Sequence, residues 1–243
     1  MVNRLKKLVL NSGKWITWLL VIFLVVSVAL GFITNVPVHV TESDKAVFRS
    51  TLGLKKPAGP LTYTQEIELI RSVQALIFDL VPIGEPIPQY ADREPVDLFR
   101  QNSGLCYDRS RTYDKVFSWL GFETRHIYIL YSEHPVTGEA LPFIRALFTK
   151  GIGSHAVTEV KTSKGWILVD SNSAWISIAA NGLPINVDHL QEQEAQLPGM
   201  PDYFNTPYIA IRGMYSRRGQ FYRPYVPYPE LNWVDFFEWI GGK

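Results

Sequence analysis

The sequence is poor in cysteine and in charge, and each shortage excludes a class of protein. Its 243 residues include one cysteine, Cys106, which can form neither an intramolecular disulfide nor a zinc site made of several cysteines. Lysine and arginine together number 24 and aspartate and glutamate 23, without the basic excess typical of nucleic-acid binders. No spaced acidic cluster of the Ca²⁺-binding type is visible. We therefore expect no nucleic-acid partner, no metal and no cofactor.

The apolar residues, 47% of the chain, are concentrated near its beginning. Residues 15–34 carry no charge and would span about 30 Å as a helix, the thickness of a bilayer's hydrocarbon core. Basic residues precede this run, so the positive-inside rule makes 1–14 a cytoplasmic basic segment and 15–34 a transmembrane signal anchor. The chain after it would lie outside the cytoplasm, on the periplasmic side of the inner membrane. A signal peptide cleaved after Ser27-Val28-Ala29 is the alternative, although the run is longer than a usual signal core.

Helical and extended patterns alternate after the anchor. Residues 35–61 contain proline and glycine with little periodicity and predict a linker. Thr62 and Gln65 have the spacing of a capping box, and apolar residues from Ile67 to Leu80 continue with a helical period. A short helix is expected from Asp92 or Arg93 through Arg100, with Pro95 in its first turn.

Cys106 stands at the beginning of the next expected helix, residues 105–120, which Gly121 would cap. The first turn of a helix has unpaired N–H groups and a positive dipole end, which lower the pKa of a thiol there. Gly104 would let a substrate backbone approach closely. A small buried hydrophobic residue is the alternative interpretation of a lone cysteine.

A period of two follows, which predicts strands over 124–131, 154–161 and 165–171. If the last two strands form a hairpin with a two- or four-residue loop, Lys161 pairs with Trp166 and Asp170 lies opposite Val157. His155 shares a sheet face with Val157, because side chains alternate along a strand. The register therefore predicts that His155 and Asp170 are diagonal neighbours on one face.

These residues occur within four longer motifs, and together the motifs resemble the transglutaminase-like superfamily of papain-type thiol enzymes. The motifs are Gly104-Leu105-Cys106-Tyr107-Asp108, residues 119–125 (WLGFETR), residues 154–160 (SHAVTEV) and residues 165–170 (GWILVD). The resemblance covers roughly residues 62–180. It implies an α+β fold in which the helix bearing the cysteine packs on an antiparallel sheet, here preceded by one N-terminal transmembrane helix.

The resemblance also implies roles for individual residues. Cys106 would be the nucleophile, His155 the general base and acid, and Asp170 the carboxylate that orients the imidazole. An oxyanion hole would use the backbone N–H of Cys106 and an upstream side chain, for which we suggest Gln101. Gly104 and Tyr107 would line the substrate cleft. Family members often have tryptophan where this chain has Val157, so the acyl and acceptor preferences do not carry over.

Aromatic residues crowd the end of the chain, interleaved with arginines. We divide the region outside the membrane into the linker, a core over 62–182 and an aromatic-rich C-terminal extension over 183–243. The extension could bind a peptide or sugar polymer or cover the cleft, but packing of its rings on the core or on a partner is the favoured interpretation. The spacing of Trp233, Phe236, Phe237 and Ile240 predicts a short amphipathic C-terminal helix, which could touch the membrane surface or another membrane protein.

The sequence thus predicts a membrane-anchored cysteine hydrolase or acyltransferase that acts through an acyl-enzyme on an amide or ester bond. Its expected partners are the membrane, through residues 15–34, and a protein, peptide or envelope-polymer substrate. The alternative is a non-catalytic module of the same fold that serves envelope polymer assembly.

Overall fold

A computed structural model describes residues 2–88, 91, 93–131, 152–190, 192, 197–215 and 230–242. The chain divides into two compact units, Met1–Asn35 and Val36–Lys243. The first unit is the helix α1, Val2–Thr34. Its window Lys14–Gly31 has a mean hydropathy of 2.1 and is long and apolar enough to cross a membrane.

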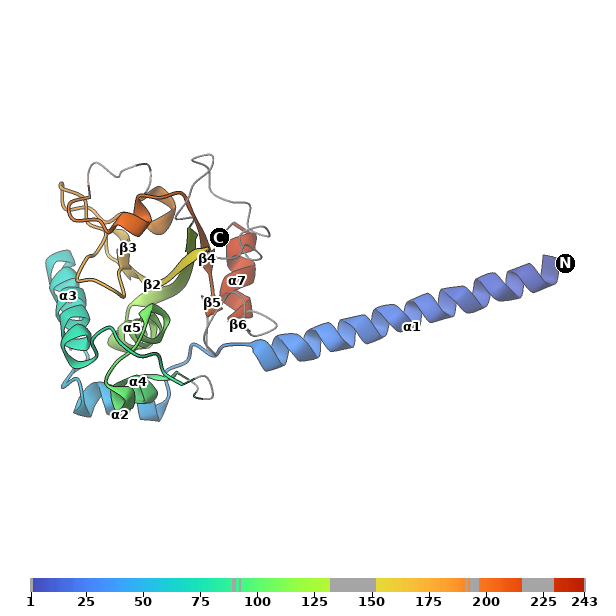
Figure 1. Ribbon diagram of the computed structural model, residues 1–243, viewed down its shortest axis with the longest axis horizontal. Coiled ribbons are helices and arrows are strands. Elements are labelled where there is room, and N and C mark those ends of the chain that lie inside the picture. Colours follow the sequence, from blue (N-terminus) through green and yellow to red (C-terminus); the bar gives the residue numbers. More distant parts are fainter. Residues whose placement is uncertain are drawn as a thin grey trace. The chain divides into compact units, whose positions relative to one another are not determined.

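The second unit combines helices with an antiparallel sheet (Figure 1). Its main helices are α2 (Glu42–Ser50), α3 (Tyr63–Leu80), α4 (Pro95–Gln101), α5 (Cys106–Leu120) and α7 (Trp233–Ile240). Its strands are β1 (Glu123–Tyr131), β2 (Gly153–Thr162), β3 (Gly165–Val169), β4 (Tyr208–Arg212), β5 (Met214–Tyr215) and β6 (Glu230–Leu231). Short 3₁₀ turns cover Val187–His189 and Asp202–Phe204.

The principal sheet has the strand order β3-β2-β1-β4, with every neighbouring pair antiparallel. Lys161 pairs with Trp166 across a two-residue turn, so the register expected from the sequence is confirmed. The strands alternate as expected: Tyr128 and Leu130 join one hydrophobic cluster, whereas Ile127 and Ile129 join the cluster on the opposite face.

The helix α5 packs against β1 and β2 (Figure 1). Its inward residues Tyr113, Val116 and Phe117 are fully buried beside α3 and β2. Gly121 ends the helix with φ of 106°, a left-handed conformation that glycine adopts without steric cost. The expected α+β arrangement of a cysteine-bearing helix on an antiparallel sheet is therefore present.

The helix α3 begins where the capping-box spacing indicates. The Thr62 side chain accepts a hydrogen bond from the Gln65 N–H, and the Gln65 side chain accepts one from the Thr62 N–H. Ile67, Ile70 and Val73 are buried on the face toward α5, as the helical period predicts.

The segment 35–61 differs from the expected linker, because it contains α2 and contributes to the core. Thr41 and Asp44 form a capping box at the start of α2, and Phe48 is fully buried against Trp119, with ring centroids 5.5 Å apart. Lys115 of α5 pairs with Asp44 at 2.9 Å. The helix has few apolar residues and is held by this burial and pairing, which a search for periodicity does not detect.

The described aromatic residues of the C-terminal extension pack mostly on the core. Tyr203, Phe204 and Tyr208 belong to the cluster on the sheet face that carries Ile127 and Ile129. The expected C-terminal helix is α7, but it differs in its faces: Trp233 and Phe236 pack inward, whereas Phe237 and Ile240 are exposed. The rings of Phe221, Tyr222, Tyr225 and Tyr228 lie outside the described residues.

Candidate active site

Cys106, His155 and Asp170 come together from three different elements. Cys106 is the first residue of α5, His155 lies near the start of β2, and Asp170 directly follows β3. His155 Nε2 is 2.6 Å from Asp170 Oδ1, so the diagonal contact expected from the hairpin register is present. Because Nε2 is engaged with the carboxylate, Nδ1 is the nitrogen left for the thiol, to which His155 is also hydrogen-bonded.

Cys106 and His155 each stabilise the charged form of the other. Burial alone raises the pKa of the Cys106 thiol, but the hydrogen bond and charge of His155 and the backbone N–H groups of Ala156 and Tyr107 outweigh it. The thiol pKa therefore lies below its ordinary value. Burial lowers the pKa of His155, but the hydrogen bonds to Asp170 and Cys106 raise it to about 9. Between these values the stable form is a thiolate–imidazolium pair, in which the sulfur is a ready nucleophile.

The Asp170 carboxylate is buried and has several donors. Ser173 Oγ and Tyr203 Oη each donate to Oδ2 at 2.5 Å, and the Asn172 N–H donates to Oδ1 at 3.3 Å. Burial raises the pKa of Asp170, but the hydrogen bonds from His155, Ser173 and Tyr203 bring it below the ordinary value. A carboxylate held in this way stays charged and fixes the orientation of the imidazole.

Tyr203 was not identified as a site residue from the sequence. Besides its hydrogen bond to Asp170, its ring lies against the imidazole of His155, with centroids 4.4 Å apart. It comes from the 3₁₀ turn Asp202–Phe204, 33 positions after the aspartate. Its only sequence signal was its place in an aromatic-rich region, because no local spacing connects it to the hairpin.

Two buried polar side chains hold the loop after β3. Arg109 of α5 donates to the carbonyl oxygens of Ser171 (2.5 Å) and Gly104 (2.9 Å), and so joins the loop after Asp170 to the residues before Cys106. Gln74 of α3 donates from Nε2 to the carbonyl oxygen of Asp170 at 2.8 Å. These bonds fix the backbone at Asp170 and at the residue that follows it.

The three remaining expected site residues have different surroundings. Gln101 is exposed at the end of α4, and among the described residues no hydrogen bond joins it to Cys106. Gly104 is buried, and an added Cβ would lie 2.6 Å from Leu98 Cδ1 of α4, so packing leaves little room for a side chain here; its expected place in the substrate cleft stays a prediction. Tyr107 is half-buried, with the Arg93 guanidinium 4.5 Å above its ring.

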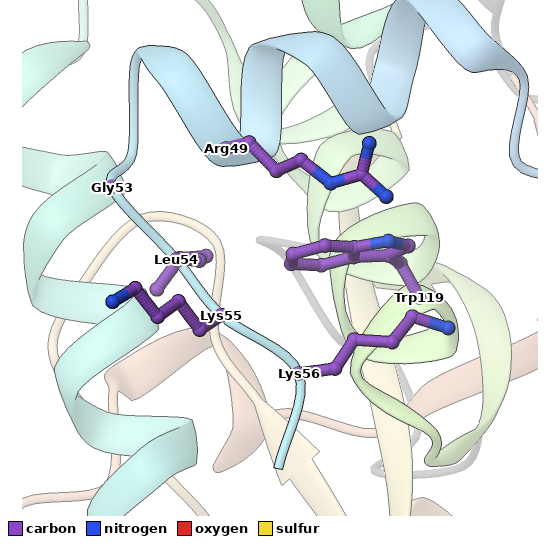
Figure 2. A pocket seen from close by; sticks show the side chains of 6 residues that line it. All are labelled: Arg49, Gly53, Leu54, Lys55, Lys56 and Trp119. Atoms are coloured by element: carbon purple, nitrogen blue, oxygen red, sulfur yellow. The ribbon is translucent and has the colours of Figure 1, made fainter. Parts of the chain in front are cut away.

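A separate cavity of about 490 Å³ lies near the other end of α5 (Figure 2). Figure 2 shows the Trp119 indole between the side chains of Arg49 and Lys56, whose charges are 6.0 and 5.8 Å from the ring centroid. Thirteen residues, or about 20 Å of helix, separate Trp119 from Cys106. The cavity lining contains no cysteine, histidine, hydroxyl or carboxylate side chain, and cations are favourable at a helix C-terminus. It is therefore distinct from the candidate active site.

Comparison with known proteins adds one match. The family model of the transglutaminase-like superfamily matches residues 58–171, a range that includes Cys106, His155 and Asp170. No curated protein matches the sequence. Among the residues that the structure describes, no group of three His, Cys, Asp or Glu side chains could hold a metal ion.

Proposed function

Since residues 58–171 form a transglutaminase-like domain, we propose that this protein is a membrane-anchored cysteine hydrolase or acyltransferase acting on an amide or ester carbonyl. Members of this superfamily are usually cysteine-based enzymes. The observation that carries the proposal is the hydrogen-bonded series from Cys106 through His155 to Asp170, with a thiol pKa below the ordinary value. A lone structural cysteine has no physical need of such partners.

In the proposed reaction the Cys106 thiolate attacks the carbonyl carbon and forms a tetrahedral oxyanion. The Cys106 backbone N–H can stabilise this oxyanion, because the first N–H of a helix has no acceptor within it. Gln101 remains our suggested second donor. When the intermediate collapses, the His155 imidazolium gives its proton to the leaving amine or alcohol, and a thioester to Cys106 is left.

His155, now neutral, then acts as a general base. It takes a proton from water, which gives an acid, or from an amine, which gives a new amide, and the Cys106 thiolate leaves. Asp170 stabilises the charged imidazole and holds its Nε2 throughout. Peptidase, amidase and transglutaminase activities share these steps, and the nature of the acceptor distinguishes them.

We further propose that α1 is the membrane anchor and that the catalytic domain lies on the extracytoplasmic side. The support is the uncharged run of residues 15–34 with lysines and arginines before it, which favours an inside N-terminus. Substrates would then be proteins, peptides or polymers of the cell envelope.

Acyl-enzyme trapping tests the proposed reaction. The full chain in detergent is mixed with p-nitrophenyl acetate, and peptide mapping by mass spectrometry locates the acetyl group. We expect acetylation of Cys106 in the wild type and none at this position in Cys106→Ser. His155→Asn should reduce the rate of acetylation by about 10²- to 10⁴-fold, because the thiolate is no longer stabilised.

His189→Asn is the matched control, because His189 is exposed on a 3₁₀ turn and, within the described part of the chain, its side chain bonds only Asn186. It should acetylate at the wild-type rate. A wild-type protein whose Cys106 is not acetylated, or whose rate is unchanged in His155→Asn, would contradict the enzymatic proposal and favour a non-catalytic module.

A further inference from the structure

The helix α7 exposes an apolar stripe although its opposite face is already packed. Val234, Phe237 and Ile240 are 66%, 62% and 60% exposed and follow one another at three-residue intervals. The other face, with Trp233, Phe236 and Trp239, packs against the cluster that includes Met214 and Leu231. A helix that is apolar on both faces needs a second apolar environment.

The position of α7 in the chain indicates what this environment is. Val36 donates its backbone N–H to the Leu231 carbonyl oxygen (2.9 Å), and Asn232 Nδ2 donates to the Val36 carbonyl oxygen (2.9 Å). Asn232 is also the N-cap of α7. Val36 follows the last residue of the apolar run by two positions, and two residues span at most about 7 Å. The start of α7 is therefore held close to the point where the chain would leave the bilayer.

We propose that α7 lies in the surface of the bilayer that α1 spans, with Val234, Phe237 and Ile240 in contact with lipid. This inference rests on the membrane anchoring proposed above. The charged residues of α7 are Asp235 and Glu238, without lysine or arginine, so burial of apolar side chains and not attraction to anionic headgroups would hold it there. A zwitterionic lipid surface is accordingly sufficient.

This contact would orient the active site as well as the domain. Cys106 and Tyr107 pack against the same hydrophobic cluster as Trp233, Phe236 and Trp239 of α7. With α1 as the only attachment, the domain could rotate about its connection. With α7 as a second attachment, the cluster that packs against Cys106 stays at a fixed height above the lipid. The active site then also stays near the membrane surface, and this position favours substrates that lie there.

Fluorescence quenching in vesicles tests this arrangement. Cys106→Ser gives a full-length chain without cysteine. Phe237→Cys or Ile240→Cys then adds one cysteine on the apolar stripe, and this cysteine is labelled with an environment-sensitive nitrobenzoxadiazole group. Leu183→Cys is the control, because this residue is exposed and far from α7. Its neighbour Gly182 accepts a hydrogen bond from the Tyr63 hydroxyl of α3, and α3 lies on the opposite side of the domain from α7 (Figure 1). Val25→Cys reports on α1. Each chain is reconstituted in phosphatidylcholine vesicles with and without doxyl-labelled lipid.

We expect labels at 237 and 240 to emit at shorter wavelength than the label at 183 and to lose a larger fraction of their emission to doxyl lipid. Strong quenching at 25 with equal, weak quenching at 237, 240 and 183 would overturn the proposal while the anchor stands. Shielding of 237 from aqueous iodide without quenching by doxyl lipid would also overturn it, in favour of a second copy on this face. Absence of quenching at 25 would instead contradict the membrane anchor itself.

Discussion

The reactivity of Cys106 depends on a proton that His155 holds more tightly than the thiol does. Because the thiol pKa is lowered and the pKa of His155 is raised to about 9, the thiolate–imidazolium form exists in the interval between them. Below this interval the sulfur becomes protonated and loses nucleophilicity. Above about pH 9 the imidazolium loses the proton that a leaving group needs. The rate of the proposed acyl transfer should therefore show a bell-shaped dependence on pH.

Alkylation of Cys106 by iodoacetamide, followed by mass spectrometry over a range of pH, measures the lower limit of this interval. In the wild type the rate should fall as pH decreases through a midpoint below the usual thiol value of about 8.5. In His155→Asn the midpoint should move above that value, because burial then acts on the thiol without the opposing charge. Coincident midpoints in the two proteins would contradict a coupled pair.

The sequence allowed these two partners to be predicted because both lie on one hairpin. Alternation along β2 and the register at Lys161 and Trp166 are local properties, and they were enough to place His155 beside Asp170. Tyr203 could not be placed in this way, because its contact with Asp170 depends on how the chain after β3 folds back over the sheet. For the same reason, the carbonyl partners of Gln74 and Arg109 were not predictable.

At the scale of elements, capping determines where α3 begins. Thr62→Ala removes the side chain that accepts the Gln65 N–H and should lower the free energy of unfolding by about 1 kcal/mol. Urea denaturation followed by circular dichroism measures the change. Thr64→Ala is the control, since Thr64 is an exposed residue two positions further on and takes no part in the capping box. Equal losses in the two variants would count against a specific cap.

A buried ion pair joins α2 to α5, and a double-mutant cycle measures how strongly. Lys115→Met leaves the buried carboxylate of Asp44, and that of Glu94, without their shared cation and should lower the free energy of unfolding by about 3–5 kcal/mol. In Asp44→Asn the amide oxygen can still accept the Thr41 N–H. With asparagine at position 44, Lys115→Met no longer leaves a charged carboxylate unpaired there. The free energy of unfolding of the double variant should therefore fall by less than the sum of the two single decreases.

Lys161→Met provides the comparison for an exposed pair. Lys161 bonds Glu123 at 2.7 Å on the surface, and its loss should cost less than about 1 kcal/mol. Strict additivity in the Lys115 and Asp44 cycle would show that α2 and α5 are not coupled through this pair.

The helix α2 illustrates the limit of pattern reading at this scale. The long apolar periods of α3 and α5 predict helices without any knowledge of their surroundings, because each helix buries a continuous stripe. The nine residues of α2 bury only Asp44 and Phe48, and the burial of Asp44 depends on Lys115, 71 positions later. Such a helix is determined by tertiary contacts and not by its own sequence.

At the scale of the whole molecule, the folded unit includes the segment before residue 62. A fragment of residues 36–243 should therefore unfold in one cooperative transition in urea. A fragment of residues 62–243 lacks Phe48 against Trp119 and the Asp44 partner of Lys115, and it should lose this cooperativity. Intrinsic fluorescence and circular dichroism should give coincident transitions only for the longer fragment. Equal stability of the two fragments would mean that α2 is dispensable.

The hydrogen bonds between Val36 and residues 231 and 232 have a mechanical consequence. The second unit receives any pull from α1 at Val36, and there the load passes first to these two bonds, which tie the beginning of the unit to its last helix. The strand pairs that carry His155 and hold Asp170 lie further along the chain. With α1 anchored as proposed, tension on it would therefore act on these two hydrogen bonds before it reached the hairpin that carries His155 and Asp170.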